Sequence, residues 1–190
     1  MSGTILDYEI FGRELGLKPD ETTFIKVEYS PFPEQNRPIY THIKGGKLSR
    51  KDRGLESYKK CADAIATIAS KYPDQKGLIL PFTNDIEDGI VEALKDNHPL
   101  VYARLRQHSK IPKERDAVFR EFEDEQNNEI LISTYANQGF DGKMVGFTVI
   151  AKVPFGPLGD IQVKAKAEND PKWYQMMTAV ELAQMAGRCV

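Results

Sequence analysis

Two side chains near the end of the sequence have a spacing suited to phosphate recognition. Gln184 and Arg188 lie four residues apart, so on a helix they share one face. Gly187 has no side chain, which allows another surface to approach the backbone closely. An arginine in this position can bind a phosphate through two parallel hydrogen bonds. The alternative is a surface arginine that complements the negative end of a helix dipole.

Two further pairs of residues could contact a nucleotide or a nucleic acid. Gly139 and Asp141 form a G-x-D sequence that could bring a carboxylate onto a sugar hydroxyl, or could be a turn glycine beside a solvated aspartate. Thr83 and Asn84 come where a helix is expected to begin. They could donate hydrogen bonds to a phosphate there, because helix N-termini favour anions, or could simply cap the helix.

Several well-known catalytic sequences are missing from the 190 residues. The chain contains no G-x-x-x-x-G-K-[ST] loop, no G-x-G-x-x-G after a strand, no G-x-S-x-G and no H-E-x-x-H. It therefore has no loop to cradle a triphosphate by itself, and it is not expected to be a self-sufficient NTPase, a lipase-like hydrolase or a zinc peptidase. Cys61 and Cys189 lack the paired spacing of a metal site, so we predict none.

The composition is that of a globular domain, with 41% hydrophobic and 28% charged residues and a net charge of −2. A near-neutral chain binds nucleic acid only through a local patch. Two basic stretches, 44–53 and 104–113, are the candidates, although such clusters are most often solvated faces. No stretch approaches the roughly 18 apolar residues of a membrane span, so no membrane partner is expected.

Hydrophobic periodicity predicts the elements that would position these residues. Helices are expected over 5–17, 55–72, 84–94, 112–125 and 172–188, and strands over 39–43, 77–82, 130–134 and 146–151. This alternation predicts an α/β fold with a mostly parallel sheet covered by helices on both faces. Ligands of such sheets bind beyond the carboxyl ends of the strands, which draws attention to the loops after Phe82, Thr134 and Lys152.

Taken in order, short motifs along nearly the whole chain resemble the second motor domain of the XPD/DinG family of superfamily-two DNA helicases. Each motif alone is weak, but their order and spacing together are specific. The segments that carry the resemblance are Met1–Ile5 for motif III, Ser30–Arg37 for the S-P-F-x-x-x-N-R segment, Gly77–Asn84 for motif IV, Ile130–Gly142 for motif V, Val153–Phe155 for the P-F turn and Gln184–Arg188 for motif VI.

The resemblance implies one RecA-like three-layer α/β/α domain over 1–190, without a Walker A loop of its own. It also implies that Arg188 is an arginine finger, that Gln184 orients toward the same nucleotide, and that Gly187 adjoins it. Gly139 and Asp141 would lie beside the ribose. The remaining implied site residues are Thr83, Asn84, Ser133 and Thr134 for single-stranded DNA, and Ser2 and Thr4 for coupling the nucleotide state to the DNA grip.

Two features depart from the family pattern. Gln138 stands where the family has a glutamate, and the second arginine of motif VI would fall just past Val190. We therefore expect a fragment of a longer helicase, whose ATP and Mg²⁺ are held with the first RecA-like domain. An iron–sulfur cluster could lie upstream. The fragment alone is expected to bind no cofactor and to be inactive.

The resemblance further implies a cytoplasmic or nucleoid-associated monomer that moves 5′→3′ on single-stranded DNA, with DNA repair among its processes. The competing hypothesis is a degenerate RecA-like module that only binds nucleic acid or a protein partner. Gln138 and the near-neutral charge support this second reading.

Overall fold

The computed structural model describes residues 5–27, 35, 38–124, 126–136, 140 and 144–187. Residue contacts divide the chain into two compact units. The first, which we call the helical unit, comprises Met1–Asn36 and Val153–Gln184, and the second, the sheet unit, comprises Arg37–Lys152 and Met185–Val190. That residues 1–190 act as one motor domain stays a prediction.

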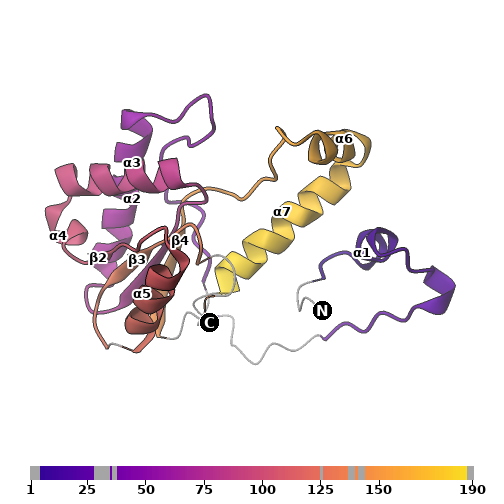
Figure 1. The fold of residues 1–190 in the computed structure, drawn as a ribbon, viewed down its shortest axis with the longest axis horizontal. Coiled ribbons are helices and arrows are strands. Elements are labelled where there is room, and N and C mark those ends of the chain that lie inside the picture. Colours follow the sequence, from indigo (N-terminus) through magenta and orange to yellow (C-terminus); the bar gives the residue numbers. More distant parts are fainter. Residues whose placement is uncertain are drawn as a thin grey trace. The chain divides into compact units, whose positions relative to one another are not determined.

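The sheet unit is built on four parallel strands in the order β2-β3-β1-β4 (Figure 1). The strands are β1 Lys76–Leu80, β2 Leu105–Arg106, β3 Ile130–Ile132 and β4 Val145–Ile150. Its helices are α2 Leu55–Lys71, α3 Asn84–Asn97, α4 Pro99–Tyr102 and α5 Pro112–Asp124. The predicted RecA-like three-layer arrangement with a parallel sheet is confirmed.

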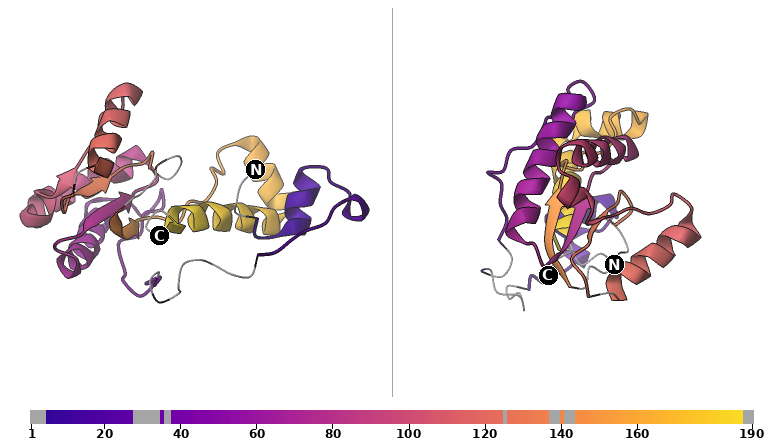
Figure 2. Two further views of the ribbon diagram at one scale, coloured as in Figure 1. Left: turned by 90° about the horizontal axis from the view of Figure 1, so that it is seen from below. Right: turned by 90° about the vertical axis from the view of Figure 1, so that its left-hand side faces the viewer.

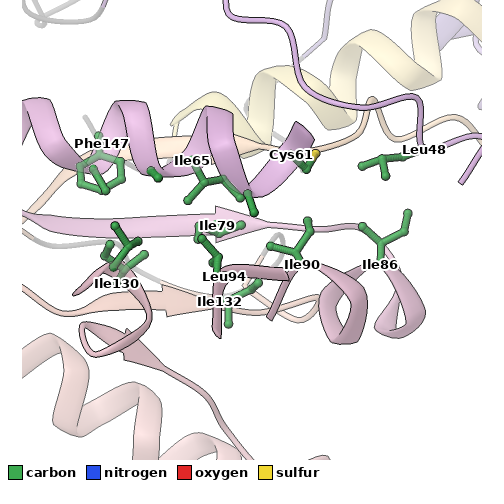
Figure 3. Packing of buried hydrophobic residues seen from close by; sticks show 14 residues of the cluster. Leu48, Cys61, Ile65, Ile79, Ile86, Ile90, Leu94, Ile130, Ile132 and Phe147 are labelled. Atoms are coloured by element: carbon green, nitrogen blue, oxygen red, sulfur yellow. The ribbon is translucent and has the colours of Figure 1, made fainter. Parts of the chain in front are cut away.

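Alternating residues of each strand pack on opposite faces of the sheet, as the pleat requires. Ile79, Ile130 and Ile132 are fully buried against α2 and α3, whose buried residues Ile65 and Ile90 meet them from two helices (Figure 3). On the other face, which α5 covers (Figure 2), the buried residues belong to a second cluster. That cluster comprises Leu78, Leu80, Phe122, Leu131, Ala136, Phe140, Val145 and Met185. Burial on both faces explains why these strands have apolar runs rather than alternating sequences.

A bulge at the start of β4 lets Val145 and Phe147 face opposite sides. Val145 pairs with Lys76, but the next pair is Phe147 with Gly77, so Gly146 is an extra residue. The ring of Phe147 then lies over Gly77, where a Cβ would come within 2.3 Å of the ring. Gly77 is therefore required by this packing.

The first basic stretch is anchored to the sheet unit. Leu48 is buried in the core beside α2. A Cβ on Gly46 would meet the backbone of Ser57 at 2.0 Å, so this loop lies directly on the first turn of α2. Glycine permits that close approach.

The second basic stretch is largely used inside the fold. Arg104 donates to the carbonyl oxygens of Ala69, Tyr72, Gln75 and Asn128 at 2.8–3.2 Å, which satisfies carbonyls at the end of α2. Burial lowers the pKa of its guanidinium. The neighbouring Arg106 pairs with Glu121 and Glu129. These two arginines are structural rather than free for a ligand.

The helical unit contains α1 Tyr8–Glu14, a 3₁₀ turn Pro19–Glu21, α6 Ile161–Asn169 and most of α7 Pro171–Ala186. Asp7 caps α1 by accepting from two backbone amides at 3.0 Å, and Gly16 follows the helix with φ 68°. Two ion pairs, Arg13 with Asp170 and Glu14 with Lys166, connect α1 to α6 and to the residue after α6.

Some local predictions are wrong. Residues 39–43 form no strand, because no described strand pairs with them. The sequence pattern missed α4 and the two-residue strand β2, which are too short to produce a periodic signal. It also missed α6, which buries no residue and therefore has no apolar stripe.

Candidate functional site

The carboxyl ends of β1, β3 and β4 lie next to one another in the sheet. Ile79 pairs with Ile132, and Leu80 pairs with Ile150, so the three strands stop at the same level. The loops that follow them therefore begin side by side. This is the sheet edge that parallel topology favours for ligands.

All four residues predicted to contact DNA follow β1 or β3, and two of them touch. The Thr134 hydroxyl donates a 2.9 Å hydrogen bond to Oδ1 of Asn84, the first residue of α3. Thr83 directly precedes Asn84 at the N-cap position. The topology thus brings Thr83, Asn84 and Thr134 together, as their placement after neighbouring strands predicts.

Thr83 occupies the cap position of α3 without capping it. Its side chain makes no cap hydrogen bond, and its hydroxyl oxygen is buried without a partner of normal geometry among the described residues. The Thr83 hydroxyl nevertheless lies beside the Asp85 carboxylate. This contact lowers the pKa of Asp85, and the positive charge of Arg53 lowers it further. Arg53 also forms an ion pair with Asp85.

The residue before Thr83 has an unusual backbone. Phe82 has φ 78°, in the left-handed region that a bulky residue seldom adopts. Such strain often occurs at functional sites, and here it sets the direction of the turn from β1 into α3. Lys152, just after β4, holds its Nζ 5.3 Å from the centroid of the Phe82 ring. A cation therefore lies at the same strand ends.

We call this group of residues the strand-end surface. Its members are Arg53, Phe82, Thr83, Asn84, Thr134 and Lys152. All of them belong to the sheet unit. The surface presents the NH₂ group of Asn84 and the ammonium of Lys152 beside the Arg53–Asp85 ion pair, and amide and ammonium donors recognise phosphate oxygens.

Ser133, the fourth predicted DNA contact, points into the fold. It is fully buried, and its hydroxyl oxygen accepts from the amides of Tyr135 and Ala136 at 3.0 and 3.2 Å. His108 Nδ1 lies 2.8 Å from the Ser109 carbonyl and must donate to it, so Nε2 accepts the Ser133 proton at 2.8 Å. The Ser133 hydroxyl therefore donates one hydrogen bond and accepts two, which is the most that a hydroxyl can form. Its side chain shapes the loop after β3.

The same loop presents an aromatic ring beside a cation. Tyr135 is 37% exposed, and the Arg115 guanidinium lies 4.7 Å from the centroid of its ring. His108 meets the same ring edge-on at 5.7 Å. The loop after β3 is therefore held by packing on one side and exposes part of a ring on the other.

The predicted nucleotide-binding residues are only partly within the described ranges. Gln184 lies near the end of α7 and is half-buried, and Gly187 follows that helix and is exposed, with nothing within 4 Å of a Cβ placed there. The predicted residues outside the described ranges are Ser2, Thr4, Gly139, Asp141 and Arg188, together with Gln138.

Sequence reasoning missed Arg53 and Lys152 as individual members of the strand-end surface. For Lys152 a signal was present, because it follows a strand in the same way as Thr83 and Thr134 do. For Arg53 no local pattern could separate it from the other cations of the 44–53 stretch, since its ion pair with Asp85 depends on tertiary structure.

In the described part of the chain, no three His, Cys, Asp or Glu side chains gather as they would around a metal ion. Within the same residues, no helix has the length and hydropathy needed to cross a bilayer.

Comparison with known proteins identifies the family. No curated protein matches the chain. Residues 55–190, more than two thirds of the sequence, match the family model of the helicase C-terminal domain. The match includes every member of the strand-end surface except Arg53, as well as the segment of Gln184, Gly187 and Arg188. With its parallel sheet and flanking helices, the chain belongs to the helicase C-terminal domain family of the DinG/XPD type.

Proposed function

We propose that this chain is the C-terminal motor half of an ATP-dependent DNA helicase that translocates on single-stranded DNA and unwinds the duplex. Its strand-end surface would form part of the DNA grip, and Arg188 would be the arginine finger. The observation that carries the proposal is the contact of Thr134 with Asn84 at 2.9 Å, which joins the loops after β3 and β1 in one surface.

The strand-end surface is suited to a DNA backbone. Thr134 fixes the amide of Asn84 through its Oδ1, which leaves the NH₂ group as an oriented donor for a phosphate oxygen. Lys152 supplies positive charge, whereas the charge of Arg53 is balanced by its ion pair with Asp85. Contacts of this kind position a strand without reading its sequence.

The nucleotide side of the proposal rests on the match to the helicase C-terminal domain and on the predicted motif VI. ATP and Mg²⁺ would be held by the first RecA-like domain, while Arg188 would stabilise the charge of the transferred phosphoryl group. Gln184 and Gly187 would lie beside the same phosphates, and Gly139 and Asp141 beside the ribose. Ser2 and Thr4 would couple the nucleotide state to the DNA grip.

Fluorescence anisotropy with a labelled oligo-dT tests the DNA grip. The chain should bind weakly at low salt, with an affinity that falls as salt rises because counterions are released. Lys152→Ala should weaken binding and lower the salt slope by about one ion. Lys95→Ala removes the same charge from the opposite end of α3, where Lys95 is exposed, and should change neither.

Two results would contradict the proposal. An absence of binding at low salt would exclude the DNA grip. Equal losses of oligo-dT affinity from Lys152→Ala and Lys95→Ala would mean that only the net charge of the chain matters.

The chain alone should show no Mg-ATP turnover, since it contains no Walker A loop. DNA binding without ATPase activity in the longer protein would favour the alternative, a degenerate binding module.

A further inference from the structure

A carboxylate lies directly behind the proposed DNA contacts. Glu87, one turn into α3, accepts a 3.1 Å hydrogen bond at Oε2 from the backbone amide of Thr134. The hydroxyl of the same threonine bonds to Asn84. Thr134 is therefore held at two points by the first turn of α3, and Glu87 supplies one of them.

The surroundings of Glu87 disfavour its charge. Burial raises the pKa of its carboxyl to about 7, and the like charge of Asp88 adds to this, while the Thr134 amide and Lys110 act in the opposite direction. Asp88 is on α3 itself, and Lys110 comes from the segment between β2 and α5. Two other ionisable neighbours are already engaged, since Asp85 pairs with Arg53 and His108 bonds to Ser133.

A phosphate arriving at Asn84 and Thr134 would bring a negative charge next to this carboxylate. Like charges at close range favour the protonated form of an acid. By linkage, a ligand that favours protonation binds more tightly where protons are more available.

We propose that Glu87 is a positioning residue of the DNA grip and that binding of single-stranded DNA is coupled to protonation of its carboxyl group. The inference rests on the proposed function. A neutral carboxylic acid still has a carbonyl oxygen that accepts from the Thr134 amide. Proton uptake therefore removes the repulsive charge while the loop after β3 stays in place.

Oligo-dT binding at about pH 6 and about pH 8 tests the coupling. With a pKa of about 7 for Glu87, the wild-type affinity should fall by up to about tenfold across this interval. Glu87→Gln keeps the acceptor and removes the charge, so its affinity should lose this pH dependence and exceed that of the wild type at the higher pH. Glu92→Gln removes the same charge from an exposed residue further along α3 and should keep the pH dependence.

Calorimetry on the wild-type chain and on Glu87→Gln gives a second test. Binding heats near pH 7, measured in two buffers with different ionisation enthalpies, should report net proton uptake that Glu87→Gln abolishes. If the wild type binds with no proton uptake, or if Glu87→Gln keeps the wild-type pH profile, the coupling is refuted and the DNA grip stands. If no binding occurs at low salt, the proposed function fails as well.

Discussion

Thr134 and Asn84 are 50 residues apart in the sequence, yet the hydroxyl of one donates to the side-chain oxygen of the other at 2.9 Å. Each follows a strand, and β1 and β3 are neighbours in the sheet. The hydrogen bond therefore links the start of α3 to the loop after β3. A change in the position of either loop would be transmitted to the other.

Removing this link should weaken both stability and DNA binding. Thr134→Val keeps the shape of the side chain but cannot donate to Asn84. We expect a loss of about 1 kcal/mol in the free energy of unfolding, the usual contribution of one such hydrogen bond. A comparable loss in binding would lower oligo-dT affinity about fivefold. Urea denaturation and fluorescence anisotropy measure the two effects.

Thr67→Val is the matched control for that variant. Thr67 is exposed on α2, and its hydroxyl bonds only to the Asp63 carbonyl of its own helix among the contacts described. It should leave oligo-dT affinity unchanged. Wild-type DNA affinity in Thr134→Val would show that the link between the two loops has no part in binding.

The sequence predicts the layers of this fold better than its details. Ile79, Ile130 and their neighbours form short apolar runs, which predict buried strands, and the parallel arrangement then places Thr83 and Thr134 at one edge. The inward orientation of Ser133 could not be predicted, because it depends on His108, which is 25 residues away. The roles of Arg104 and Glu87 could not be predicted either, because their hydrogen-bond partners are backbone groups of other segments.

Gly77 offers a test of the sheet packing. Gly77→Ala would place a Cβ 2.3 Å from the Phe147 ring, so we expect a destabilisation of about 1–3 kcal/mol in urea denaturation. Gly54→Ala is the control, because a Cβ there meets nothing within 4 Å and its backbone is extended. In the Gly77→Ala background, Phe147→Leu should restore part of the stability. A neutral Gly77→Ala would contradict the close approach.

The raised pKa of Glu87 predicts a pH-dependent stability without DNA. Between pH 4.5, the ordinary pKa of this carboxyl, and about pH 7, the folded state holds a proton that the unfolded chain has lost. Stability from this group is therefore greatest below the unfolded pKa and decreases as the pH rises through the folded one. Glu87→Gln should match the wild type near pH 4.5 and be more stable above pH 7.

The expected gain is about 1–2 kcal/mol, reduced from the full linkage value because the carboxyl is partly exposed. Denaturation midpoints across the pH range measure it. Glu92→Gln, which changes an exposed carboxyl further along α3, should follow the wild-type curve. Parallel curves for Glu87→Gln and the wild type would show that burial does not perturb this group.

Arg188 is the decisive residue for the proposed motor function, and its test uses this chain together with the first RecA-like domain that the proposal requires. Arg188→Ala should lower DNA-stimulated ATP turnover by ~10³-fold or more, because an arginine finger stabilises charge that develops only in the transition state. Arg188→Lys keeps the positive charge but cannot donate two parallel hydrogen bonds, so it should recover only part of the rate. Oligo-dT affinity and the denaturation midpoint should stay at wild-type values in both variants. Arg120→Ala, at an exposed position of α5, is the control for loss of a surface arginine. Turnover in Arg188→Ala within a few-fold of the control would mean that another residue supplies the finger, or that this family member is a binding module rather than a motor.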